Sequence, residues 1–146
     1  MDSTLFLRPL LPEPGVITAR KPSEDEQRDL DYGYKIAREL GRLDIGQSVA
    51  VCEGACIALE AMEGTDAVME RAASLVNGKP IRVVKLAKPN QDLRFDVPVI
   101  GLPTIRLMAR VHATAIAIEA RKTLLIDRDE LIAEANANGI AIVAME

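Results

Sequence analysis

The feature of this 146-residue sequence that most limits its fold is an alternation of short apolar runs with amphipathic segments, repeated from residue 24 to the end. Runs of four to eight β-branched and apolar residues predict buried strands, whereas apolar residues spaced three and four apart predict helices. The alternation of both kinds is typical of a mixed β-sheet with helices packed against it. We therefore expect an α/β fold in a single compact domain.

The clearest helix signal lies at residues 24–41. Ser23 and Glu26 form a capping-box pattern at its start, and Gly41 can end it. The remaining predicted helices are residues 66–76, residues 104–111 and residues 129–138, the last with Asp127 as its N-cap.

The clearest strand signal is a pair of β-type runs at residues 47–52 and 55–61. They are separated by Glu53-Gly54, whose glycine suits a tight turn, so we expect an antiparallel hairpin. Further strands are predicted at residues 81–87, 114–119, 123–126 and 140–144.

The first part of the chain combines an apolar run with several prolines. Residues 3–11 are apolar, and Pro12, Pro14 and Gly15 then predict an extended connector. A linker from a preceding domain and a native N-terminus folded onto the body fit this composition equally. We take residues 1–22 as a linker from a domain that precedes this sequence, and residues 23–146 as the domain itself.

Composition limits the function. The net charge of −4 comes from interspersed acids and bases, so we expect no nucleic-acid partner, and apolar runs far shorter than about 20 residues leave at most peripheral membrane contact. Cys52 and Cys56 indicate the reducing cytoplasm and are better explained as buried thiols than as a nucleophile or half of a zinc site. His112 is the only histidine, so a histidine-based triad is excluded, and it is expected at the surface.

Residues 88–98 carry the most informative polar pattern. If the segment is extended, Asp92, Arg94 and Asp96 point to one side. Two carboxylates beside a guanidinium suit phosphate chemistry with Mg²⁺ or Mn²⁺, in which a metal-bound water is the nucleophile. A solvated edge strand whose charges pair with one another explains the same pattern.

A second polar stretch leaves a strand and opens a helix at residues 60–66. Gly64 and Thr65 can present backbone N–H groups to a phosphate there, and Glu63 and Asp66 add carboxylates. The ordinary alternative is that Thr65 caps a helix and Asp66 is a favourable residue of its first turn.

Four blocks, Asp44-Ile-Gly-Gln47 and residues 60–66, 87–98 and 119–124, together resemble the signature blocks of the LpxI-type UDP-2,3-diacylglucosamine pyrophosphatases in order and spacing. The resemblance runs from Leu10 to Ile142. It implies hydrolysis of UDP-2,3-diacylglucosamine to UMP and lipid X in lipid A biosynthesis, with a divalent metal and a substrate held between two domains. Full-length family members carry another domain ahead of this segment, so we expect this chain alone to be inactive or nearly so.

The resemblance also assigns roles to individual residues, with Asp92 as the first choice for the essential aspartate. Arg121 and His112 depart from the family pattern outside the proposed centre. The candidate catalytic residues are Asp92, Asp96, Glu63 and Asp66, the candidate metal ligands are Asp92 and Asp96, and the candidate substrate contacts are Lys88, Gln91, Arg94, Gly64, Thr65, Thr104 and Lys122.

Two other functions remain open at this point. The same basic residues and Gly-Thr turn could form a non-catalytic nucleotide- or phosphosugar-binding module. The domain could also be a lid or a dimerisation module, and a homodimer fits either case. Metal binding distinguishes the enzyme from both alternatives.

Overall fold

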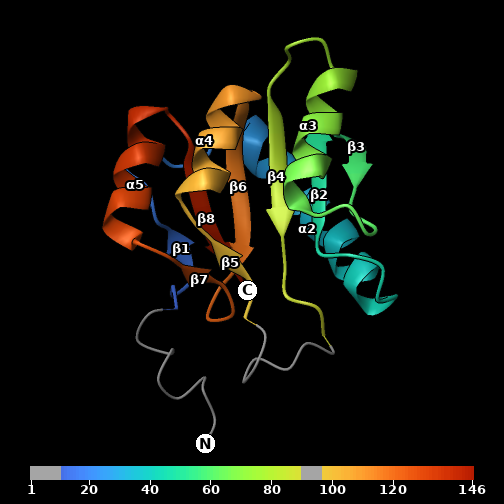
Figure 1. Cartoon of the computed structure of the whole chain (residues 1–146), viewed down its shortest axis with the longest axis horizontal. Coiled ribbons are helices and arrows are strands. Elements are labelled where there is room, and N and C mark those ends of the chain that lie inside the picture. The colour runs from blue at the N-terminus through green and yellow to red at the C-terminus, as the bar shows by residue number, and fades with distance from the viewer. Residues whose placement is uncertain (1–10, 90–96) are drawn as a thin grey trace, which may run out of the picture.

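The computed structural model describes residues 11–89 and 97–146. They form a mixed β-sheet between helices on both faces, so the predicted α/β fold is confirmed (Figure 1). The helices are α2 (Glu24–Arg42), α3 (Thr65–Leu75), α4 (Leu102–Arg110) and α5 (Arg128–Ala137), and the strands are β1 (Gly15–Val16), β2 (Ser48–Cys52), β3 (Ala55–Leu59), β4 (Ile81–Lys85), β5 (Val99–Ile100), β6 (Ala113–Glu119), β7 (Leu124–Leu125) and β8 (Ala141–Met145).

The main sheet has six strands in the order β1-β8-β6-β4-β2-β3. Strands β4, β6 and β8 are parallel, β2 and β3 form the predicted antiparallel hairpin, and β1 pairs antiparallel with β8. Because β2 is antiparallel to both β3 and β4, strands β3, β4, β6 and β8 all run in one direction. Their final residues lie at one end of the sheet, which we call the carboxyl edge and which is at the bottom of Figure 1.

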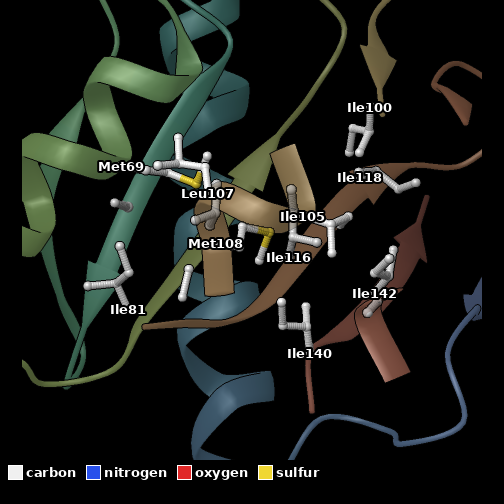
Figure 2. Packing of buried hydrophobic residues seen from close by; sticks show 14 of the residues in the cluster. Met69, Ile81, Ile100, Ile105, Leu107, Met108, Ile116, Ile118, Ile140 and Ile142 are labelled. Carbon is white, nitrogen blue, oxygen red and sulfur yellow. The ribbon is translucent and has the colours of Figure 1, made fainter. Parts of the chain in front are cut away.

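Each face of the sheet has its own hydrophobic core, because successive side chains of a strand point to opposite faces. On one face α2 packs Leu30 and Leu40 against strand residues such as Val84. On the other, α3, α4 and α5 cover the larger core, part of which is drawn in Figure 2. A Cβ at Gly33 of α2 would lie 2.9 Å from Val84 Cγ2, so glycine allows the close approach of this helix.

Several local details differ from the sequence-based predictions. Helix α2 continues through buried Gly41 to Arg42, and Asp44 takes the positive φ (57°) that follows. Asp127 stands at the N-cap of α5, as predicted, but its side chain makes no capping hydrogen bond. Strand β7 lies outside the main sheet and pairs with β5.

The segment before α2 is attached to the body along its length. The N–H of Arg121 donates to the Pro12 carbonyl (2.8 Å), and the Ile142 N–H donates to the Thr18 hydroxyl (3.0 Å). Strand β1, which the sequence did not predict, forms in this segment because β8 offers it backbone partners. The assignment of residues 1–22 to a linker between domains stays a prediction. No helix in the described part of the chain is long and apolar enough to cross a membrane.

Candidate functional site

The carboxyl edge brings together three connections that are distant in sequence. They are the turn between β3 and α3, the loop that leaves β4, and the turn between β6 and β7. Parallel α/β sheets bind ligands where their strands end, since several loops and helix N-termini converge there. Residues 44–47, just before β2, lie at the same edge, since Lys88 pairs with Asp44 and the Gln47 N–H donates to Glu60. The described parts of all four polar sequence blocks therefore meet at one edge.

The first part of the site is the start of α3. Thr65 is the first helical residue and Gly64 is the N-cap, so the interpretation of Thr65 as the cap is wrong. The hydroxyls of Thr65 and buried Ser48 lie 2.7 Å apart, which joins α3 to the beginning of β2. Within the described part of the chain no side-chain hydrogen bond caps α3, so its first N–H groups can be offered to a ligand.

Lys85, at the last position of β4, is a candidate that the sequence analysis missed. Its ammonium group donates to the Val99 carbonyl (3.2 Å). Burial lowers the pKa of Lys85, and the negative charges of Glu60 and Asp66 oppose that shift. The sequence analysis treated Lys85, at the end of an apolar run, only as part of a strand. Its position three residues before Lys88, a predicted substrate contact, is the signal that could have identified it.

Glu60 is fixed at the same place by its backbone and its side chain. Its N–H donates to the Ser48 carbonyl (2.9 Å), and its carboxylate accepts the N–H of Gln47 (2.7 Å). The carboxylate is therefore held at the start of β2, where its negative charge interacts with the Lys85 ammonium group.

Glu63 and Asp66, which were predicted to act together, have different surroundings. Glu63 accepts the N–H of Ala61 (2.7 Å) and pairs with Arg71 on α3 (3.0 Å). The hydrogen bond from Ala61 lowers the pKa of Glu63. Asp66 is exposed in the first turn of α3 and contributes to the charge around Lys85. Of the two, Asp66 is better placed to act with Lys85.

A second group of charges lies at the ends of β4 and β6. Lys88 Nζ lies 3.5 Å from Asp44 Oδ1, and Lys122 Nζ lies 3.1 Å from Glu119 Oε2. The other oxygen of Glu119 accepts the N–H of Ala87 (3.1 Å), which fixes the start of the loop after β4. The structure thus brings both predicted lysines to the carboxyl edge.

The loop after β4 leaves and returns at this edge. Pro98 stands just before β5, and its carbonyl accepts the N–H of Leu124 (2.8 Å). Thr104 lies half-buried in the first turn of α4, which follows β5. The remaining predicted site residues, Gln91, Asp92, Arg94 and Asp96, lie outside the described residues.

The described residues alone do not form a complete metal centre. Within residues 11–89 and 97–146, no group of three or more His, Cys, Asp or Glu side chains is placed to hold an ion. Mg²⁺ usually takes one or two protein carboxylates together with phosphate oxygens and water. Asp66 could supply one such carboxylate, whereas Asp92 and Asp96 remain the predicted ligands.

The two cysteines and the histidine lie away from the carboxyl edge, and their surroundings indicate structural roles. Burial raises the pKa of both Cys52 and Cys56, which disfavours the reactive thiolate. His112 is exposed, as predicted, in the turn before β6, with Nδ1 2.8 Å from the Gly78 carbonyl oxygen.

A cavity of about 410 Å³ at the opposite end of the sheet is a weaker candidate. Arg82 and Asp29 are among its lining residues, but they already pair with each other at 3.2 Å. Asp29 also accepts the N–H of Gly54 (2.9 Å). We therefore place the candidate site at the carboxyl edge.

Comparison with known proteins gives a family and one curated relative. The family model described as the LpxI C-terminal domain matches residues 13–143. The chain is 40% identical over 132 residues to a UDP-2,3-diacylglucosamine pyrophosphatase LpxI of Caulobacter vibrioides. The match covers 86% of this chain and 47% of the relative, so the chain spans about half the length of that protein.

Proposed function

The chain belongs to the LpxI C-terminal domain family, and from this premise we propose that it forms one wall of the active site of a UDP-2,3-diacylglucosamine diphosphatase. The proposed products are UMP and 2,3-diacylglucosamine 1-phosphate, an intermediate of lipid A biosynthesis. In this hydrolysis the oxygen of water bonds to one phosphorus, and the bridging oxygen leaves with the other phosphate.

The convergence of Lys85, Thr65 and Asp66 at the carboxyl edge is the observation that carries the proposal. A diphosphate needs positive charge and N–H or O–H donors around its oxygens, since charge builds on these oxygens during hydrolysis. Lys85 supplies the charge, and the start of α3 supplies donors beside a favourable helix dipole.

Each residue has a distinct proposed role. Lys85 and Lys88 bind phosphate oxygens, and Asp66 orients the attacking water. Asp92 and Asp96 would hold Mg²⁺ or Mn²⁺, which when bound neutralises phosphate charge and activates water. Arg94 and Lys122 would contact the phosphates from the neighbouring loops.

The site is proposed to be completed by the part of the enzyme that this chain does not span. Catalysis between two domains depends on positioning that one wall cannot supply, so the chain alone is expected to be inactive or nearly so. We place the enzyme in the cytoplasm, with its lipid substrate reached by peripheral contact with the inner membrane.

The test is an assay of UMP release by this chain joined to the N-terminal part of an LpxI enzyme. Asp92→Asn and Asp96→Asn should each lower the rate at least tenfold, whereas Asp129→Asn, an exposed carboxylate on α5, should not. Full activity in both loop variants would remove the catalytic assignment. Substrate binding without metal-dependent hydrolysis would favour the non-catalytic binding module.

A further inference from the structure

We propose that an apolar groove between edge strand β3 and helix α3 holds an acyl chain of the diacylated substrate. This inference rests on the proposed function and adds a subsite that is separate from the diphosphate site. Two adjoining cavities of about 510 and 300 Å³ form the groove, and they share Ile57 and Leu75.

The lining of the groove is apolar in the middle and charged at both ends. Leu59 and Leu75 are 40% and 61% exposed, although both are large apolar side chains. Ion pairs stand at the two ends, Glu63 with Arg71 and Glu53 with Lys79. A contiguous apolar surface between charged ends is typical of a binding surface for an apolar ligand.

Arg71 argues against a further β-strand as the occupant. Its guanidinium donates to the Leu59 carbonyl (2.7 Å) while it pairs with Glu63. This carbonyl is therefore already satisfied, and the arginine lies where a strand would pair at this end of β3. A hydrocarbon chain needs no backbone partners and suits the groove better.

The groove begins at the candidate active site. Ala61 and Glu63 line its first cavity, and both belong to the turn that carries Glu60 into Thr65. An acyl chain attached to a sugar at the carboxyl edge would enter the groove past the Glu63–Arg71 ion pair. The five residues of β3 give the groove a length of about 16 Å, enough for a long acyl chain but far more than an acetyl group uses.

The experiment measures binding of two probes to the 146-residue chain by titration calorimetry below the micelle concentration. One probe is glucosamine 1-phosphate with two long acyl chains, and the other is its diacetyl analogue. Leu59→Asp and Leu75→Asp change exposed positions, so both should fold. Val16→Asp is the control, since Val16 is 46% exposed on β1, the opposite edge strand.

Each groove variant should weaken binding of the long-chain probe about tenfold and leave the affinity for the diacetyl probe unchanged. Val16→Asp should change neither affinity. Equal long-chain affinity in wild type and both groove variants would overturn the proposal. If sedimentation shows a wild-type dimer that both groove variants dissociate, the groove holds a second copy and the proposal also fails.

The two proposals fail in different ways. If the groove is wrong, the diacetyl probe still binds, but Leu59→Asp and Leu75→Asp do not change the affinity for the long-chain probe. If the diphosphate site is wrong, the diacetyl probe does not bind, while long-chain binding still depends on these two leucines.

Discussion

The backbone of Gly46 lies directly against the carbonyl group of Glu60, where β2 begins and β3 ends. A Cβ at position 46 would overlap the Glu60 carbonyl oxygen and carbon. Next to this contact, the Gln47 N–H binds the Glu60 carboxylate (2.7 Å). One glycine therefore allows the approach that places Glu60 beside Lys85.

We expect Gly46→Ala to destabilise the protein by about 1–3 kcal/mol, because backbone atoms must move to accept the methyl group. Gly101→Ala is the matched control, since its added Cβ would lie 3.6 Å from Pro103 Cδ at an ordinary φ of −134°. Urea unfolding of both variants measures the difference. Equal midpoints would show that the Gly46 contact is easily relieved.

Replacing Lys85 tests the role of the residue that the sequence analysis missed. In the assembled enzyme, Lys85→Met should lower kcat/KM at least tenfold, because the phosphates lose a positive charge next to Asp66. Thermal melting should show that the variant folds. Lys35→Met, on the exposed side of α2, should keep full activity. A normal rate for Lys85→Met would exclude this lysine from the phosphate site.

Glu26 should make the stability of the domain depend on pH. Burial alone would raise its pKa, but hydrogen bonds from the Arg20 guanidinium and the Ser23 N–H outweigh burial and lower the pKa from 4.5 to about 2. A carboxyl with a lowered folded-state pKa stabilises the protein above its ordinary pKa, and this stability is lost as pH falls from 4.5 towards 2.

The expected loss is on the order of 2 kcal/mol, because the Arg20 partner is 41% exposed and therefore screened. Denaturant unfolding of wild type and Glu26→Gln should differ at pH 7 and converge near pH 2. A constant difference between the two proteins across this range would contradict the assignment to Glu26.

Removing only one partner of the ion pair between Arg82 and Asp29 should strongly lower the free energy of unfolding. Their side chains are only 12% and 5% exposed, so Arg82→Met leaves a buried carboxylate without its cation and should cost about 3–5 kcal/mol. Adding Asp29→Asn should recover part of this loss. Arg42→Met at the exposed Glu39 pair should cost less than about 1 kcal/mol. A double-mutant cycle with no coupling energy would contradict this prediction.

The sequence by itself determined the elements that depend on near neighbours. Both hydrogen bonds of the α2 capping box form. Ser23 Oγ accepts from the Glu26 N–H (3.1 Å), and the Glu26 carboxylate accepts from the Ser23 N–H (2.9 Å). The β2–β3 hairpin formed where Glu53-Gly54 predicted it. Lys88 and Pro89 follow the end of β4, whereas Asp92 and Asp96 lie outside the described residues and their roles stay predictions.

Only the tertiary structure decided which strand ends share an edge and therefore which charges meet. Arg20 reaches the Thr114 and Gly139 carbonyls across 94 and 119 residues of sequence, and Lys85 joins Asp66 only because β4 lies beside β2. Local patterns report the preference of a segment for helix or strand. Strand order and edge composition instead depend on backbone pairing and packing between distant segments, which no short pattern encodes.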